Sequence, residues 1–148
     1  MIKTVLIADD EEHIRDLLTS AMQYLHFEVV GKAENGKEAS ELYIELNPDL
    51  ILLDINMPGK KGFEVAKEIL ENNSEAFIII LSIFSQESKI KEITGGNNVF
   101  FIRKDNPLPK IVTLIRECIN NYKPKKITYL KQMMNEIKED EDFDSLET

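Results

Sequence analysis

Five short runs of apolar residues divide the chain at regular intervals. They are Val5–Ala8, Phe27–Val30, Leu50–Leu53, Phe77–Leu81 and Val99–Ile102. Four of these runs are almost continuously apolar, which is typical of strands that are buried on both faces of a parallel sheet. Glu28 interrupts the run at 27–30, so we expect this strand to lie at an edge of the sheet.

Segments with helical periodicity lie between and after these runs. Apolar residues recur at spacings of three and four within 14–25, 39–46, 63–70 and 111–119, and a short polar segment at 87–94 completes the alternation. Strands that alternate with helices form a parallel sheet through right-handed crossovers, with helices on both faces. The pattern therefore predicts an α/β fold with a doubly wound, five-stranded parallel sheet.

The pattern changes after Pro124. Four apolar residues recur there at helical spacing, namely Ile127, Leu130, Met134 and Ile137. They predict one more amphipathic helix, and the acidic run at 139–144 is expected to be a solvated end. We therefore expect one domain over residues 1–122, followed by a C-terminal amphipathic helix and acidic tail over 123–148.

Length and charge narrow the class of protein. The chain has 148 residues, the size of one ordinary domain, with 18 Lys and Arg against 27 Asp and Glu and a net charge of −9. This balance argues against a surface that binds nucleic acid directly. Cys118 is the single cysteine, so neither an intrachain disulfide nor a thiolate metal site can form. Without an apolar run of about 20 residues or a signal peptide, the chain is expected to be cytoplasmic and to have no membrane partner.

The candidate chemistry lies where the predicted strands end. Asp9 and Asp10 follow the first strand, Asp54 closes the third, Ser82 closes the fourth, and Lys104 lies just past the fifth. Open α/β sheets bind ligands at the carboxyl ends of their strands. If the strand order is 2-1-3-4-5, three carboxylates, a hydroxyl and an ammonium converge on one pocket.

Three crowded carboxylates repel one another unless a cation lies among them. Oxygen ligands in a partly hydrated site suit Mg²⁺, with Mn²⁺ as an alternative ion. A carboxylate at the edge of such a metal can attack a phosphoryl group and form an acyl phosphate, while a lysine and a hydroxyl share the charge of the phosphoryl oxygens. The pocket therefore predicts metal-dependent phosphoryl chemistry.

The sequence resembles the receiver domain of two-component response regulators over residues 1 to about 122. The motifs that carry the resemblance are Ile7–Glu11, Leu53–Pro58 with Gly62, Leu81–Ser82 and Phe101–Lys104. The resemblance implies a flavodoxin-like three-layer fold with strand order 2-1-3-4-5. Lys104 and Asp105, followed by Pro107, are similar to the subclass fused to LuxR-type helix-turn-helix output domains.

The resemblance also implies a role for each candidate residue. Asp54 would be the phosphoacceptor, Lys104 would pair with the phosphoryl group, Ser82 would hydrogen-bond it, and Phe101 would move inward with Ser82 as a switch. The metal ligands would be Asp9, Asp10, Asp54 and the backbone carbonyl of Asn56. Ile83, which follows Ser82, is bulkier than the residue found in many receivers and would narrow the path of water to the phosphoryl group.

The function that follows is a two-component signalling switch. A sensor histidine kinase, a phosphotransfer protein or a small donor such as acetyl phosphate would phosphorylate Asp54, and the change would reach a downstream protein target, a missing output domain or a second copy in a homodimer. The domain would catalyse only its own phosphorylation and dephosphorylation, so we do not expect an enzyme.

Other interpretations of these residues stay open. The chain could be the N-terminal part of a DNA-binding regulator, a haloacid-dehalogenase-type phosphatase with an aspartyl nucleophile, or a flavodoxin-type FMN protein. However, it has no D-x-D pair after the first strand and no Ser/Thr/Gly-rich phosphate loop. The acidic pair could instead cap the first helix, and Phe101 could be an ordinary core residue.

Overall fold

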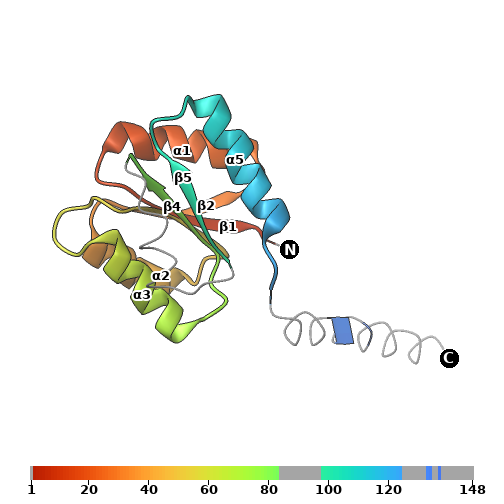
Figure 1. Cartoon of the computed structure of the whole chain (residues 1–148). Coiled ribbons are helices and arrows are strands. Elements are labelled where there is room, and N and C mark those ends of the chain that lie inside the picture. Colours follow the sequence, from red (N-terminus) through yellow and green to blue (C-terminus); the bar gives the residue numbers. More distant parts are fainter. Residues whose placement is uncertain (1, 84–97, 125–132, 135–136, 138–148) are drawn as a thin grey trace.

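The computed structural model describes residues 2–83, 98–124, 133–134 and 137 (Figure 1). The strands are β1 (Thr4–Ala8), β2 (Glu28–Ala33), β3 (Leu50–Asp54), β4 (Ile78–Ser82) and β5 (Val99–Arg103). The helices are α1 (Glu12–Tyr24), α2 (Gly36–Leu46), α3 (Gly62–Asn72) and α5 (Leu108–Asn121). These strands match the five apolar runs to within a few residues at each end.

The strands form one parallel sheet in the order β2-β1-β3-β4-β5, which confirms the predicted topology. The strand with the interrupting Glu28 lies at an edge, also as predicted. It continues beyond the predicted run, through Gly31 and Lys32 to Ala33. Its register with β1 shifts between Val5 and Leu6, and the parallel pairing continues after the shift. An edge strand pairs with a neighbour on one side only and can carry polar residues. The apolar pattern in the sequence therefore did not mark Gly31 and Lys32 as part of the strand.

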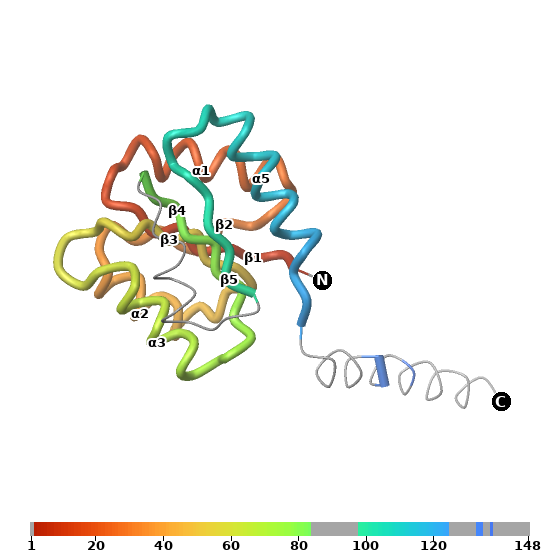
Figure 2. Tube along the Cα trace, viewed as in Figure 1, coloured from red at the N-terminus to blue at the C-terminus, as the bar shows by residue number. Residues whose placement is uncertain are grey.

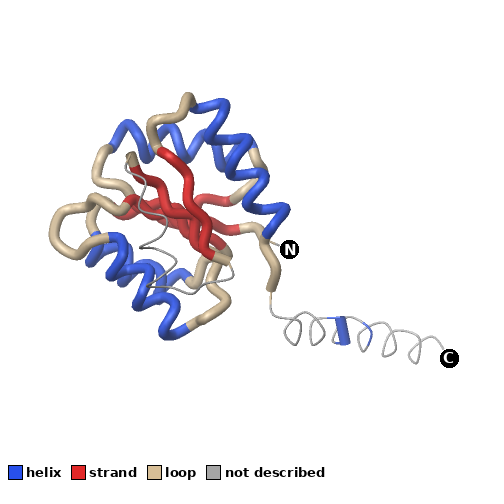
Figure 3. The backbone as a smooth tube through the Cα atoms, in the orientation of Figure 1, coloured by secondary structure: helices blue, strands red, loops and turns tan. Residues whose placement is uncertain are grey.

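Helices cover both faces of the sheet, and the fold therefore has three layers (Figures 1 and 3). Alternate residues of β1 face opposite layers: Leu6 packs in the core beside α2 and α3, whereas Val5 and Ile7 pack in the core beside α1 and α5. Because both faces are covered, β3 and β4 are buried along their whole length. This double burial is the physical cause of the continuous apolar runs.

Short polar contacts fix the ends of the helices. The side chain of Asn35 accepts a hydrogen bond from the backbone N–H of Glu38 at 2.8 Å and caps the start of α2. Asn47 ends that helix in the left-handed conformation, with φ 44°. The turn leads into Asp49, whose carboxylate accepts hydrogen bonds from the backbone of Lys3 at 2.8 Å and Thr4 at 3.0 Å and so ties β1 to the start of β3.

The end of α5 is fastened to the start of β5, as the chain trace in Figure 2 helps to follow. The buried side chain of Asn98 accepts a hydrogen bond from the backbone N–H of Lys123 at 2.9 Å and donates one to its carbonyl at 2.8 Å. Beside this pair, the ring of Tyr122 stacks on Phe77 with centroids 4.6 Å apart. These contacts fix the point at which the chain leaves the last helix.

Two predicted helices lie wholly or mostly outside the described residues. They are the polar segment at 87–94 and the helix after Pro124, of which residues 133–134 and 137 are described and are helical. Within the described helices one detail differs from the expectation, because Leu17 of the apolar stripe of α1 is 44% exposed. Among the described residues no helix has the length and apolar character needed to cross a bilayer.

Candidate functional site

The candidate residues lie at the carboxyl edge of the sheet, where each is delivered by the end of a strand. Asp9 and Asp10 follow β1, and Asp54 is the last residue of β3. Lys104 follows β5, and its backbone N–H donates a hydrogen bond to the carbonyl of Ser82 at 2.8 Å. Because all the strands are parallel, these positions share one edge, as the sequence predicts.

The three carboxylates form one cluster. One carboxylate oxygen from each of Asp9, Asp10 and Asp54 lies within 4.8 Å of the other two. Asp9 is 0% exposed and Asp54 is 3% exposed, while Asp10 reaches solvent. Two buried carboxylates at this separation repel each other, so the cluster needs positive charge close by.

Lys104 supplies part of that charge. Its ammonium nitrogen Nζ lies 2.6 Å from Oδ2 of Asp9 and 3.4 Å from Oδ2 of Asp54, and its side chain is only 15% exposed. One ammonium thus faces two buried carboxylates and the nearby carboxylate of Asp10. The cluster keeps a net negative charge that a divalent cation would neutralise.

Backbone groups orient the buried carboxylates. Oδ1 of Asp9 accepts a hydrogen bond from the N–H of Glu11 at 2.9 Å, and Oδ1 of Asp54 accepts one from the N–H of Asn56 at 3.2 Å. Oδ2 of Asp9 is buried, and its polar contact among the described residues is the ion pair with the Lys104 ammonium. A buried carboxylate oxygen in this state suits a metal ligand, so the residues present fit Mg²⁺.

The same contacts shift two pKa values. Burial raises the pKa of the Asp54 carboxyl, and the charge of Asp9 adds to this, although Lys104 opposes it. Burial alone would lower the pKa of the Lys104 ammonium, but its contacts with Asp9 and Asp54 outweigh burial and raise it. Lys104 therefore stays charged at neutral pH and remains available to an anionic group beside Asp54.

A cavity of about 290 Å³ opens beside the cluster. Asp54, Asn56 and Lys104 line it, together with Asp10, Glu11, Ile14 and Ile83. Since a water molecule occupies about 30 Å³, the cavity has room for a partly hydrated cation and a phosphoryl group. Ile83 lies in the cavity wall, and the narrowing of the path of water that the resemblance implies stays a prediction.

Three predicted residues, Asp9, Ser82 and Phe101, are not in the wall of this cavity. Ser82 is buried at the end of β4, one residue past Leu81, which pairs with Asp54 in the sheet. Phe101 is half-buried in β5, where it packs against the core beside α2 and α3. The roles of Ser82 and Phe101 in a switching movement stay predictions.

Sequence reasoning missed two arginines that hold the loops around the cluster. The guanidinium of Arg15 on α1 donates a hydrogen bond to the carbonyl of Asp9 at 2.7 Å. Arg103 donates to Asp105 at 3.1 and 2.7 Å and to the carbonyl of Ile83 at 3.1 Å, which joins the loops that follow β5 and β4. Asp105, two residues after Arg103, was a sequence signal for the Arg103 contacts. Arg15 gave no such signal, because it resembles any polar residue of an amphipathic helix.

An α/β domain with an acidic, lysine-bearing cluster at the carboxyl edge of its sheet is the class that the fold and site define. Residues 5–116 match the response regulator receiver domain. The chain is 37% identical over 119 residues to the chemotaxis protein CheY of Halobacterium salinarum, across 80% of this chain and 98% of that protein. It is 33% identical over 113 residues to the transcriptional regulatory protein LiaR of Bacillus subtilis, across 76% of this chain and 54% of LiaR.

Among solved structures, the CheX–CheY–BeF₃–Mg²⁺ complex from Borrelia burgdorferi has a similar chain. The TM-score is 0.69 with 28% sequence identity, and the match covers 79% of this chain and 89% of that one. The chain belongs to the response regulator receiver domain family of two-component signalling. Receiver domains bind Mg²⁺ through an acidic pocket, and the cluster of Asp9, Asp10 and Asp54 has the composition of that pocket.

Proposed function

We propose that this chain is a phosphorylation-dependent switch in which Asp54 accepts a phosphoryl group in a Mg²⁺-dependent step. The observation that carries the proposal is the placement of Asp54. Its carboxylate is almost fully buried, lies 3.4 Å from the Lys104 ammonium and belongs to a three-carboxylate cluster beside a cavity. A carboxylate held there is costly to the fold, which is typical of a residue retained for chemistry.

In the proposed reaction a carboxylate oxygen of Asp54 attacks the phosphorus of the donor. The P–N bond of a phosphohistidine or the P–O bond of acetyl phosphate breaks, and an acyl phosphate forms on Asp54. The leaving imidazole takes a proton from solvent, whereas acetate leaves as the anion. Lys104 exchanges its contact with Asp54 for one with a phosphoryl oxygen and neutralises part of the new charge.

The metal would be held by Asp9, Asp10, Asp54 and the backbone carbonyl of Asn56. When bound, Mg²⁺ supplies Lewis-acid neutralisation of the charge on the phosphoryl oxygens. The burial of Asp9 fixes one ligand before any cation arrives, because its other oxygen is already held by the N–H of Glu11. Mn²⁺ has the same preference for oxygen ligands and is the natural comparison ion.

Signalling follows from the residues beside the cavity. Ser82 would move toward the phosphoryl group, and Phe101 would fill the space behind it, which changes the protein-interaction surface around β5 and α5. The phosphoryl donor would be a sensor histidine kinase or phosphotransfer protein in the cytoplasm. Because no separate substrate is turned over, the chain acts as a switch over residues 1–122 rather than as an enzyme.

The output of the switch has two candidate forms. The chain spans nearly all of the chemotaxis protein CheY of Halobacterium salinarum, which favours a receiver that acts through a protein partner. It spans about half of the transcriptional regulator LiaR, which favours a DNA-binding regulator with a LuxR-type output domain. We favour the first form, and reading the gene beyond the codon for Thr148 distinguishes the two.

Intact-mass spectrometry tests the proposed chemistry. Wild type, Asp54→Asn and Asp49→Asn are incubated with acetyl phosphate and Mg²⁺, Mn²⁺ or EDTA. We expect wild type and the control Asp49→Asn, whose aspartate lies at the opposite edge of the sheet, to gain one phosphoryl group with the metal and none with EDTA. A gain by Asp54→Asn equal to that of wild type, or a gain that persists in EDTA, would contradict the proposal.

A further inference from the structure

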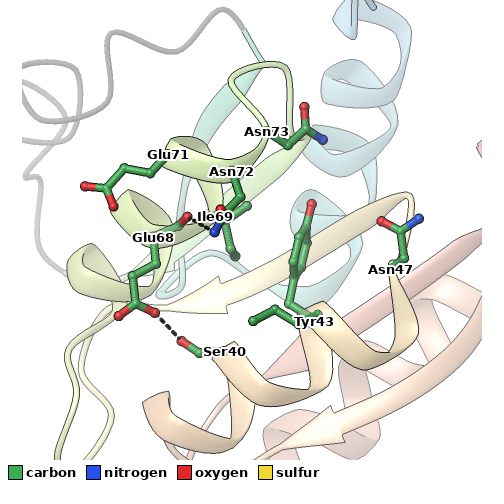
Figure 4. A pocket seen from close by; sticks show the side chains of 9 residues that line it. Ser40, Tyr43, Asn47, Glu68, Ile69, Glu71, Asn72 and Asn73 are labelled. Carbon is green, nitrogen blue, oxygen red and sulfur yellow. Dashed lines mark hydrogen bonds between the residues drawn. The ribbon is translucent and has the colours of Figure 1, made fainter.

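A second concave site lies between α2 and α3 (Figure 4), and it shares no lining residue with the cavity beside the carboxylate cluster. Its volume is about 550 Å³, larger than the cavity beside Asp54. The residues that line it are Ser40, Tyr43, Ile44, Asn47, Glu68, Ile69, Glu71, Asn72 and Asn73. We call this site the α2–α3 groove. It lies toward the amino edge of the sheet, because the turn after Asn47 enters β3 and the turn after Asn73 enters β4.

The floor of the groove is apolar and its walls are polar. Ile69 is buried beneath it, and the ring of Tyr43 stands in its middle, as Figure 4 shows. Ile44 is 76% exposed, a high value for an isoleucine on a helix that packs against the core. The walls carry amides at Asn47 and Asn72–Asn73. The groove therefore offers apolar area beside hydrogen-bonding groups, the combination found at recognition surfaces.

The charge of the groove is negative. Glu68 and Glu71 line it, and no Lys or Arg from the described part of the chain does. The carboxyl-terminal halves of α2 and α3 both form its walls, and neither helix has a basic residue in its last turn. The negative ends of two helix dipoles thus add to the two carboxylates.

Lys60 lies close to the groove and reduces the negative charge available there. Lys60 forms an ion pair with Glu68, whose other oxygen accepts a hydrogen bond from the hydroxyl of Ser40 at 3.0 Å. Both oxygens of the Glu68 carboxylate therefore already have a partner within the protein. Glu71 has no ion pair in the part of the chain that the structure describes, and it is the more available carboxylate of the two.

We infer that the α2–α3 groove binds an arginine-bearing segment of a partner protein. The aliphatic part of an arginine side chain would pack on Tyr43 and Ile44, and its guanidinium would meet Glu71, Glu68 and the carbonyls at the helix ends. An acidic segment is repelled by the same groups. This surface lies at the opposite edge of the sheet from Asp54, so the inference stands whether or not Asp54 is phosphorylated.

The full chain, labelled with ¹⁵N, is titrated with a blocked Leu-Arg-Leu-Arg peptide and followed by NMR. We expect shifts that are concentrated at the amides of 40–47 and 68–73 and that weaken as salt is added. Blocked peptides with citrulline or glutamate in place of arginine are the matched probes. They keep the apolar residues and lack the positive charge, so we expect much smaller shifts.

Variants of α3 test the role of each carboxylate. We expect the double variant Glu68→Gln with Glu71→Gln to weaken the arginine peptide by about fivefold, in line with two partly exposed ion pairs. Lys60→Met frees Glu68 and should strengthen binding about twofold. Glu64→Gln removes an exposed carboxylate of the same helix outside the groove and should leave the affinity unchanged.

Three outcomes would overturn the inference. The first is the absence of shifts at the groove with the arginine peptide, and the second is an equal response to the citrulline peptide. The third comes from sedimentation velocity: if the chain dimerises and Ile44→Arg abolishes the dimer, the groove belongs to a second copy instead. Phosphotransfer to Asp54 is measured separately by intact mass, so failure of either proposal is recognised without the other.

Discussion

Replacing Lys104 with methionine tests the electrostatic account of the site most directly. Methionine keeps much of the length and apolar surface of the lysine stem and removes the ammonium. In wild type that ammonium lies 2.6 Å from Oδ2 of Asp9 and 3.4 Å from Oδ2 of Asp54. The variant leaves two buried carboxylates facing each other with no cation from the protein, so we expect the metal-free protein to be less stable.

The size of the loss follows from the burial of the partners. Removing one partner of a fully buried ion pair costs roughly 3–5 kcal/mol, whereas an exposed pair contributes about 0–1 kcal/mol. Lys104 is 15% exposed beside a cavity, and Asp9 is fully buried. We therefore expect a loss of roughly 2–3 kcal/mol at pH 7, which lowers the melting temperature of a domain of this size by about 4–12 °C.

Magnesium should reverse much of this loss. The ammonium and a divalent cation compete for the same carboxylates, so Mg²⁺ should bind Lys104→Met more tightly than wild type. A cation at a concentration 100 times its dissociation constant adds about 2.7 kcal/mol of stability. We expect the rise in melting temperature with Mg²⁺ to be larger for the variant than for wild type.

Thermal unfolding in EDTA and in MgCl₂ measures both effects. Lys67→Met is the matched control, because Lys67 is exposed on α3 and forms no ion pair with any described residue. We expect this control to behave like wild type under both conditions. Equal stability of the two methionine variants in EDTA, or an equal response to Mg²⁺, would refute the reasoning.

Four further predictions concern other parts of the fold. A Cβ at Gly62 would lie 2.4 Å from the carbonyl oxygen of Asp54, so Gly62→Ala should cost about 1–3 kcal/mol and weaken Mg²⁺ binding, as calorimetry would show. At Gly59, with φ 74° and open space around it, alanine should cost about 1–2 kcal/mol of strain and leave Mg²⁺ affinity unchanged. Burial alone would raise the pKa of Asp49, but hydrogen bonds from the start of β1 outweigh it and hold that pKa below its usual range. The stability this group adds is therefore present above about pH 4 and is lost as the pH falls through its lower folded pKa. The deficit of Asp49→Asn in urea unfolding should be at most about 1 kcal/mol at pH 7 and should shrink as the pH falls below about 4. Burial raises the pKa of the Cys118 thiol to about 11, so a thiol reagent at pH 8 should label it only after unfolding; labelling of the folded protein at the rate of an exposed thiol would contradict this.

Much of the fold could be predicted because strands that are buried on both faces are continuously apolar in the sequence. The runs at 50–53 and 77–81 are continuously apolar because β3 and β4 are covered on both faces. This apolar pattern is weaker in strands at the edges of the sheet. The last residues of β2, from Gly31 to Ala33, include a lysine, and a polar residue at an edge strand reads like a turn. Leu17 shows the opposite error, since this apolar residue has core spacing in the sequence but is 44% exposed.

The candidate site was predictable in its charged residues and not in its scaffold. Asp9, Asp54 and Lys104 stand at strand ends, and parallel topology alone brings them to one edge. The hydrogen bond from Arg15 to the carbonyl of Asp9 depends on the direction of a single side chain, which periodicity does not encode. The groove beside Tyr43 was missed for a related reason, because it depends on how two helices that are separate in sequence pack together.

The paired hydrogen bonds between Asn98 and Lys123 join two points that are distant in the sequence. The entry to β5 and the exit from α5 are therefore tied together, so a shift of one must move the other or break these hydrogen bonds. A dye or a fused reporter attached directly after Pro124 would therefore depart from the amino edge of the sheet, at the opposite end from Asp54. Such a label could follow motion of β5 from a point outside the carboxylate cluster.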